Sequence, residues 1–382
     1  MRRETTLTGA TLVLPHAVLP GTLVVRDGRI AEIMPGPSAA PGALALHGDF
    51  LLPGIVDLHT DNLERQVQPR INARWPSRSA MVAHDAQCAA AGVTTVFDAL
   101  CLGDLGFDKD RVRTFREGIA DLDALTAAGL LRAEHFLHLR CEVPAPDMLG
   151  LFDPVSDHPL VRMVSLMDHT PGVGQYADLD RYRKLRRDGG TGADEVEARI
   201  VELQAQRGRL RGPNRQALLA RLAGRAIAVA SHDDRTEAEV AENAADGITV
   251  SEFPVTLAAA LAAHAHGMRV IAGAPNLVRG GSHSGNVGVA ALLEAGAVDA
   301  LASDYVPTSL IEAAFHRAPG ALLDPVALAD AVALVTDRPA RLAGLADRGR
   351  LEAGLRADLV QVRVHEGLPV VRAVWRAGER VA

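Results

Sequence analysis

The feature that most constrains this chain is a regular alternation of strand-like and alanine-rich helical segments between about residues 53 and 344. Eight segments have the apolar pattern of buried strands: 54–59, 93–100, 134–142, 161–169, 226–232, 247–253, 268–274 and 300–304. Helices are expected between many of them, at 80–91, 111–128, 236–245, 255–266, 287–296 and 308–317. Repeated strand–helix units imply parallel strands, so we predict an α/β chain built on a closed (β/α)8 TIM-type barrel over 53–344.

The two ends of the chain have a different pattern. Short β-rich runs separated by turn residues, such as Asp27-Gly28, occupy residues 1–52, and similar runs occupy 345–382. Because β-rich segments at both ends flank one long middle, we predict that they assemble into a single small β-sandwich.

A strandless stretch, residues 174–224, follows the fourth predicted strand. It is charged, rich in arginine and compatible with helices, as in the run Arg181-Tyr-Arg-Lys-Leu-Arg-Arg187. We interpret it as a helical arm inserted into the barrel. Three roles stay open for it: a solvated helix pair, a contact with a polyanionic substrate, or a contact with a neighbouring subunit.

Composition excludes several classes of protein. The 40 basic and 47 acidic side chains give a net charge of −7, which disfavours general nucleic-acid binding. No run of about 20 apolar residues predicts a membrane span. Three cysteines, Cys88, Cys101 and Cys141, give no disulfide framework and favour a reducing, cytoplasmic compartment. A homo-oligomer is possible.

Polar side chains stand where five of the predicted strands end. In a barrel of this type the carboxyl ends of the strands meet at one mouth, where catalytic residues collect. The residues at these ends are imidazoles and carboxylates, which are ligands for a divalent ion such as Zn²⁺, Mn²⁺ or Fe²⁺. The nearby Asp168, Asp233 and Asp234 are expected to support the ligands or to hold a substrate hydroxyl.

Several motifs resemble a known family. Leu52-Pro-Gly-Ile-Val-Asp-Leu-His59-Thr-Asp61 resembles the first-strand motif of the amidohydrolase superfamily, and 337–360 is similar to its return from the barrel to the terminal sheet. Seven further motifs, in order along nearly the whole chain, resemble its branch of α-D-ribose 1-methylphosphonate 5-triphosphate diphosphatases: 58–64, 138–142, 165–171, 231–234, 251–254, 273–276 and 280–286.

The resemblance implies a metal-dependent hydrolase of phosphonate catabolism, which converts a ribose 5-triphosphate into a 5-phosphate and pyrophosphate. It implies one or two divalent ions, with Asp304 also taking the proton of the attacking water. The expected metal ligands are His59, Asp61, Glu142, His169, His232 and Asp304. Two other functions stay open: an amidohydrolase that cleaves a C–N bond of a cyclic amide or deaminates a base, and a non-catalytic barrel without metals.

The sequence departs from the superfamily in two ways. Most members carry His-x-His on the first strand, whereas this chain has His59-x-Asp61, so Asp61 is either a ligand or a residue that orients His59. Many members bridge two metals with a carboxylated lysine. The chain has only Lys109 and Lys184, and neither ends a predicted strand, so Glu142 is the expected bridge. The role of Glu252, which ends the sixth strand, is left open.

A triphosphate also needs groups that neutralise its charge. The loop after the seventh strand offers an arginine, glycines and hydroxyl groups, and a second group of arginines follows the first strand. We expect substrate binding by Arg279, Gly280, Gly281, Ser282, His283, Asn286 and Arg65. The alternatives are a plain glycine-rich turn and surface arginines.

Overall fold

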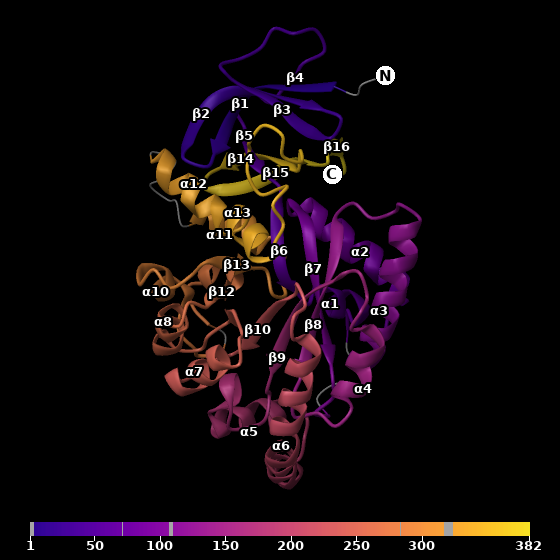
Figure 1. Cartoon of the computed structure of the whole chain (residues 1–382). Helices are drawn as coiled ribbons and strands as arrows, with labels where there is room; N and C mark the ends of the chain where they lie inside the picture. The colour runs from indigo at the N-terminus through magenta and orange to yellow at the C-terminus, as the bar shows by residue number, and fades with distance from the viewer. Residues whose placement is uncertain (1–3, 71, 107–109, 283, 317–323) are drawn as a thin grey trace.

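Eight parallel strands form the centre of the protein (Figure 1). The computed structural model describes residues 4–70, 72–106, 110–282, 284–316 and 324–382. The barrel strands are β6 (Ile55–Thr60), β7 (Val93–Leu102), β8 (Glu134–Glu142), β9 (Val161–Met167), β10 (Ala228–His232), β11 (Val250–Glu252), β12 (Arg269–Gly273) and β13 (Ala300–Ala302). Each pairs with the next strand along the chain, and all eight predicted strands are confirmed.

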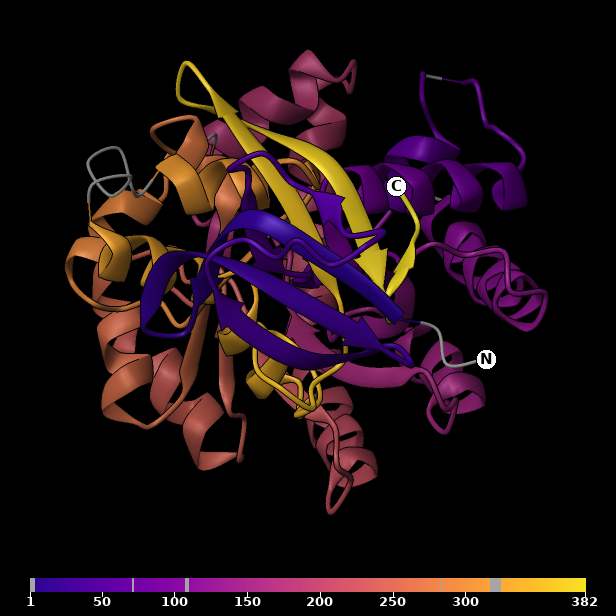
Figure 2. The same ribbon diagram turned by 90° about the horizontal axis from the view of Figure 1, so that it is seen from above.

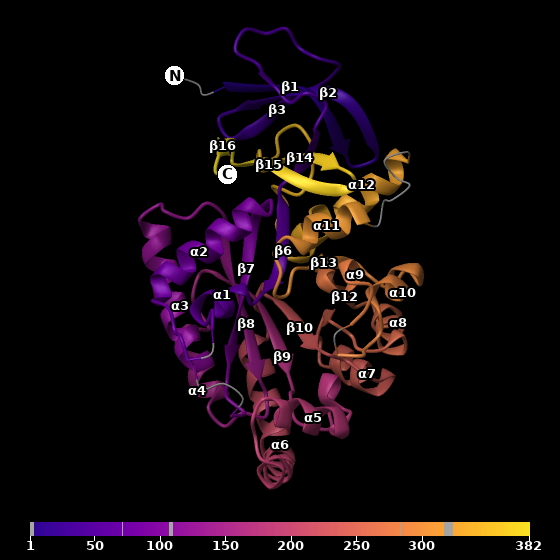
Figure 3. The same ribbon diagram turned by 180° about the vertical axis from the view of Figure 1, so that it is seen from behind.

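Helices surround the strands (Figure 3). They are α1 (Asn62–Val67), α2 (Ser77–Ala90), α3 (Asp110–Ala127), α4 (Met148–Phe152), α5 (Leu179–Asp188), α6 (Ala193–Leu222), α7 (Glu237–Ala245), α8 (Leu257–Ala265), α9 (Ala274–Val278), α10 (Val289–Glu294), α11 (Ser309–His316), α12 (Pro325–Ala333) and α13 (Asp337–Leu342), with 3-10 turns η1 (Asp153–Val155) and η2 (Gly174–Tyr176). Among the described helices, none is long and apolar enough to cross a membrane.

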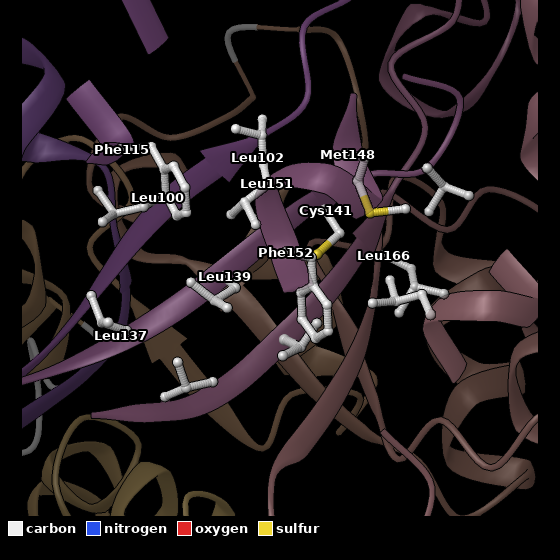
Figure 4. Packing of buried hydrophobic residues seen from close by; sticks show 14 of the residues in the cluster. Leu100, Leu102, Phe115, Leu137, Leu139, Cys141, Met148, Leu151, Phe152 and Leu166 are labelled. Atoms are coloured by element: carbon white, nitrogen blue, oxygen red, sulfur yellow. The ribbon is translucent and has the colours of Figure 1, made fainter. Parts of the chain in front are cut away.

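Alternation along β8 explains why helices cover the barrel. Figure 4 shows Leu137, Leu139 and Cys141 of this strand packed with Phe115 of α3 and Phe152 of α4. Successive side chains of a strand point to opposite faces, so these odd-numbered residues all face outwards. Each buried leucine of such a layer contributes roughly 1.5–3 kcal/mol to folding.

The even-numbered residues of β8 face the barrel interior, and the last three of them are polar. His138, Arg140 and Glu142 are all buried, at 0–6% exposure, and the predicted sharing of one face by these side chains is confirmed. The same alternation that places leucines under the helices therefore carries polar groups to the inside of the barrel.

The barrel closes between β6 and β13. At the carboxyl ends the backbone N–H of Asp304 donates to the carbonyl of His59 at 2.9 Å, and that of Asp61 donates to the carbonyl of Asp304 at 2.9 Å. At the other end of the seam, residues 334–335 after α12 bond to both strands instead. Closure is therefore direct at the mouth, where it brings His59, Asp61 and Asp304 together.

Both ends of the chain share one mixed sheet. Its order is β16 (Glu379–Arg380), β15 (Leu368–Arg376), β14 (Leu359–His365), β5 (Phe50–Pro53), β1 (Glu4–Leu14), β2 (Ala17–Arg26) and β3 (Arg29–Pro35), and β4 (Leu44–Ala45) pairs with β1. Figure 2 shows the N-terminal strands beside the C-terminal ones. The prediction that both ends of the chain assemble into one β-structure is confirmed, and the strands expected to form a sandwich belong to this one mixed sheet. It lies at the end of the molecule opposite α5 and α6 (Figure 1).

The stretch 174–224 is helical, as predicted. Leu203, Leu218 and Leu222 of α6 pack into the outer core of the barrel. The first turns of α6 instead share a separate small core with α5, formed by Tyr182, Val196 and Ile200. We use "the arm" for residues 174–200, which comprise η2, α5 and the first turns of α6 and extend beyond the barrel wall.

A charged network is buried between α2 and strands β7 and β8. The Asp98 carboxylate lies 2.7 Å from Nε2 of His84 and 2.8 Å from Nδ1 of His135, and Asp85 lies 3.3 Å from Nε2 of His135. Burial alone would lower the pKa of His135, but the carboxylates of Asp98 and Asp85 outweigh it and raise this pKa to about 9. Buried charges are tolerated here because they are paired.

This network predicts a pH-dependent contribution to stability. Because the folded-state pKa of His135 is above its unfolded value, its contribution is complete below about pH 6.5 and is lost as the pH rises through about 9. His135→Gln should therefore lower the free energy of unfolding more at pH 6 than at pH 9.5, by roughly 3 kcal/mol. Urea unfolding at both pH values measures this difference. His158→Gln, at an exposed pair with Asp123, is the control and should show a small, constant effect. An equal loss at both pH values in His135→Gln would contradict the assignment.

Candidate metal centre and active-site cavity

A cavity of about 460 Å³ opens at the carboxyl ends of the barrel strands. Its walls come from the strand ends, from the arm and, after α9, from Ser282, Ser284, Asn286, Val287 and Val289. Five of the six predicted metal ligands line it, namely His59, Asp61, His169, His232 and Asp304. The structure thus brings together side chains from β6, β10 and the segments that follow β6, β9 and β13.

Glu252 holds two of the imidazoles from behind. Its Oε1 lies 2.8 Å from Nδ1 of His59, and its Oε2 lies 2.7 Å from Nδ1 of His232. A carboxylate can only accept, so both Nδ1 atoms carry a proton, and in a neutral ring Nε2 presents a lone pair. Burial lowers the pKa of His232, but the carboxylates of Asp233 and Glu252 outweigh burial and raise it. Burial lowers the pKa of His59 to about 3, so this imidazole is neutral at pH 7. Glu252 does not line the cavity, and its open role becomes that of an orienting residue.

Glu142 holds His169 in the same way. Its Oε2 lies 2.6 Å from Nδ1 of His169, and its Oε1 accepts from the backbone N–H of the same residue at 2.8 Å. Burial raises the pKa of Glu142, but its interactions with His169 outweigh burial and lower it. Both oxygens are thus engaged, and Glu142 is not on the cavity wall. The structure favours an orienting role over the predicted bridging role, because the carboxylate faces the back of the imidazole.

Asp233 lies on the cavity wall, near the ligands as the sequence predicted, but in the position of a further metal donor. Its Oδ2 lies 3.7 Å from Nε2 of His169 and 3.7 Å from Nε2 of His232. Within the described residues, Oδ2 of Asp233 and Nε2 of His169 are buried without a hydrogen-bond partner, as is Nε2 of His59. Buried polar atoms are rarely left without partners, so three at one cavity indicate a missing group.

The cavity donors fall into two sets. In each, the donor atoms lie within 4.8 Å of one another: His169, His232 and Asp233 form one set, and His59, Asp61 and Asp304 form the other. Three protein donors and an open side are typical of catalytic metal sites. The residues present therefore fit divalent ions.

Backbone geometry turns several strand ends into the cavity. Asp233, Phe253 and Asp304, which follow β10, β11 and β13, have left-handed φ angles of 59°, 55° and 54°. Such angles are uncommon outside glycine and concentrate at functional sites. Phe253 packs its ring against His59 and His232, at centroid distances of 4.9 Å and 5.5 Å. The turns thus direct two carboxylates and one supporting ring to the same place.

The Asp304 carboxyl has an unusual environment. Burial raises its pKa, the neighbouring Asp61 raises it further, and the result is a pKa of about 8. Arg140 opposes this shift and lies 3.5 Å from Asp61 through Nη1. Carboxylates crowded into a buried site without compensating charge favour the protonated form. A bound cation beside them would remove that penalty.

The arginines that line the cavity are not those expected from the sequence. They are Arg111 of α3, Arg140 of β8 and Arg186 of α5. Arg279, Gly280 and Gly281 are absent from the wall, and Arg65 donates to the backbone oxygen of Tyr305 at 2.8 Å instead. Their role in substrate binding stays a prediction.

The remaining residues named from the sequence differ in where they lie. Ser282 and Asn286 line the cavity, whereas His283 lies outside the described residues, as does Lys109. Lys184 is exposed on α5. For Arg140 a signal was present, since it alternates with His138 and Glu142 on β8. Arg186 lies in the arginine-rich stretch for which contact with a polyanionic substrate was left open. Arg111 carries no such signal, because it lies in a helix whose contacts come from distant parts of the chain.

An eight-stranded parallel barrel that gathers imidazoles and carboxylates at one mouth defines the class of metal-dependent barrel hydrolases. The sequence profile described as "Amidohydrolase family" matches residues 236–382. The chain is 43% identical over 371 residues to the alpha-D-ribose 1-methylphosphonate 5-triphosphate diphosphatase of Escherichia coli strain K12, covering 97% of this chain and 98% of that one. The chain belongs to the amidohydrolase family.

Solved structures agree on the fold. N-acetyl-D-glucosamine-6-phosphate deacetylase from Mycobacterium smegmatis matches with a TM-score of 0.64 at 18% identity, over 99% of this chain and 100% of that chain. 5-methylcytosine deaminase from Klebsiella pneumoniae matches with a TM-score of 0.60 at 16% identity, over 99% and 97%. At these identities the likeness concerns the barrel and the terminal sheet.

The two donor sets predict separable effects on metal content. Asp233→Asn and Asp61→Asn each replace one carboxylate donor and should each weaken binding at one set by at least about tenfold, since even partners outside the ligand shell change affinity 10–100-fold. Elemental analysis after dialysis against a limiting chelator would show the loss, and the double variant should lose both ions. Thermal unfolding of the metal-free proteins controls for folding. Full metal content in Asp233→Asn would remove Asp233 from the site.

Proposed function

We propose that this protein is a metal-dependent hydrolase that releases pyrophosphate from α-D-ribose 1-methylphosphonate 5-triphosphate, leaving the 5-phosphate, in phosphonate catabolism. The observation that carries the proposal is the charge of the cavity wall. Among the described residues it combines three aspartates with three arginines, Arg111, Arg140 and Arg186. These charges balance, so bound divalent ions would leave the wall with a net positive charge suited to a polyphosphate. The name of the 43% identical relative supports the same substrate.

The two donor sets would hold the ions. His169, His232 and Asp233 offer one group of donors, and His59, Asp61 and Asp304 offer the other. Imidazole and carboxylate donors suit Zn²⁺, Mn²⁺ or Fe²⁺. Divalent ions supply two things in such chemistry: a bound water with a pKa near 7 and charge stabilisation at a phosphoryl oxygen.

The chain's own residues account for the remaining steps. The Asp304 carboxylate accepts a proton from the attacking water, whose oxygen forms a bond to the α-phosphorus. The bond from that phosphorus to the bridging oxygen breaks, and pyrophosphate leaves with the electron pair. Asp304 suits this task because it lines the cavity, with its carboxylate within 4.8 Å of the donor atoms of His59 and Asp61.

Arg140 supports the leaving group. It is 6% exposed, its Nε and Nη1 atoms have no hydrogen-bond partner among the described residues, and burial does not deprotonate it, because the pKa of this guanidinium is raised. A fixed cation beneath the cavity stabilises negative charge that develops during bond cleavage. Asn276, whose Oδ1 is likewise buried without a described partner, offers an acceptor for a sugar hydroxyl.

The two other functions fit the cavity less well. A neutral cyclic amide or base needs no group of three arginines in the wall. A barrel that had lost its metals would not need two intact sets of donors with unpaired buried atoms. Both observations favour a hydrolase that acts on a phosphoric anhydride.

A pyrophosphate-release assay tests the proposed substrate. The metal-loaded protein should release pyrophosphate from the 5-triphosphate of a ribose 1-phosphonate at a higher kcat/KM than from nucleoside triphosphates. Direct detection of pyrophosphate and of the 5-phosphate measures both products. If no triphosphate yields pyrophosphate while the metal sites are full, the proposal fails and C–N hydrolysis becomes the better hypothesis.

Two substitutions test the assigned roles. Asp304→Ala removes the proton acceptor, and Glu142→Ala releases His169 from its fixed orientation, so each should lower turnover by at least about a hundredfold. Steady-state assays at saturating metal measure both. Wild-type rates in either variant would show that the residue has been given the wrong role.

A further inference from the structure

The arm lies at the active-site cavity. Gln175 and Tyr176 of η2 and Arg186 of α5 all line its wall. The arm therefore contributes side chains to a site whose metal donors come from strand ends elsewhere in the barrel. A pair of solvated helices, one of the roles left open for this stretch, does not explain why these side chains line the cavity.

A row of aromatic contacts links the metal donors to Arg186. The ring of Tyr176 meets that of His169 at a centroid distance of 5.9 Å and that of Tyr182 at 5.5 Å. The guanidinium carbon of Arg186 lies 5.0 Å from the centroid of the Tyr182 ring. Tyr182 is 2% exposed in the small core shared by α5 and α6, so the position of Arg186 is fixed by a packed ring.

Polar contacts hold the arm against the barrel. Arg183 pairs with Glu197, which ties α5 to α6. The side chain of Arg199 donates to the backbone oxygen of Leu105, after β7. Just beyond the arm on α6, the side chain of Gln204 donates to that of Pro171, after β9. These contacts hold α5 in place through α6, and with it the side chain of Arg186.

Gly285 marks the contact between the arm and the loop across the cavity. It has a φ of +72°, and a Cβ atom there would lie 2.3 Å from Nη1 of Arg181. The arm and the segment that carries Ser282, Ser284 and Asn286 therefore meet, and both contribute to the cavity wall.

We propose that Arg186 binds the outermost phosphate of the substrate, so that the arm makes the enzyme selective for triphosphates over shorter phosphates. The inference rests on the proposed function. The contacts that lead from His169 to Arg186 pass through two tyrosine rings, whereas Arg140 lies 3.5 Å from Asp61, beside the donors. We therefore assign to Arg186 a phosphate other than the one at the metal donors. A guanidinium suits it because its planar fork binds two phosphate oxygens at once.

Binding of inorganic tripolyphosphate to the metal-loaded protein tests this without turnover. Arg186→Gln should weaken tripolyphosphate binding by about ten- to a hundredfold, as expected for a lost charge-assisted pair, and should change orthophosphate binding by less than about twofold. Arg187→Gln is the matched control, since Arg187 is exposed one residue away on the same helix and is not on the cavity wall. It should leave both affinities within about twofold of wild type. Arg186→Lys, which keeps the charge but loses the fork, should fall between.

Three results would overturn the inference: equal effects of Arg186→Gln and Arg187→Gln, an equal loss for orthophosphate and tripolyphosphate, or no loss at all. Thermal unfolding shows whether the arm remains folded in each variant. The kcat/KM ratio for the 5-triphosphate over the 5-diphosphate of the same sugar should fall at least about tenfold in Arg186→Gln. If wild-type protein releases no pyrophosphate yet the variants still differ in tripolyphosphate binding, the proposed function fails while the binding site stands.

Discussion

The buried carboxylate of Glu252 fixes two imidazoles at once, and the geometry of the cavity depends on this contact. Glu252 is fully buried at the end of β11, where an unpaired charge would cost several kcal/mol. The Nδ1–H groups of His59 and His232 compensate for it. Because the carboxylate accepts from both Nδ1 atoms, each ring turns its Nε2 atom to the cavity. One buried charge therefore determines which nitrogen two imidazoles offer to a metal ion.

The same scheme recurs around the barrel mouth and separates carboxylates by role. Glu142, like Glu252, lies behind an imidazole and orients it. Asp61, Asp233 and Asp304 lie on the cavity wall, where left-handed turns direct two of them. The glutamates that accept hydrogen bonds from the imidazoles thus lie behind the rings, and the aspartates that can donate electron pairs to a metal ion lie in front of them. The arginines complete the balance of charge, and the arm contributes one of them from outside the barrel.

Much of this could be predicted from the sequence, and the limit has a physical cause. Eight strands follow from apolar periodicity, and His59, His169 and His232 were expected at the mouth because strand ends converge there. What an acidic residue faces depends on tertiary contacts that no local pattern encodes, so Glu142 was predicted as a bridge although it lies behind His169. The glycine-rich loop indicated phosphate binding at Arg279, yet the wall takes Arg111 and Arg186 from helices.

The metal content of Glu252→Gln tests the central claim most directly. A glutamine can accept from one imidazole but must donate to the other, which moves the proton of that ring to Nε2 and blocks a donor atom. The account predicts a folded protein that binds at least one ion about 10–100-fold more weakly than wild type. Equilibrium dialysis with elemental analysis measures this, with circular dichroism to confirm folding. Full metal content at wild-type affinity would contradict the account.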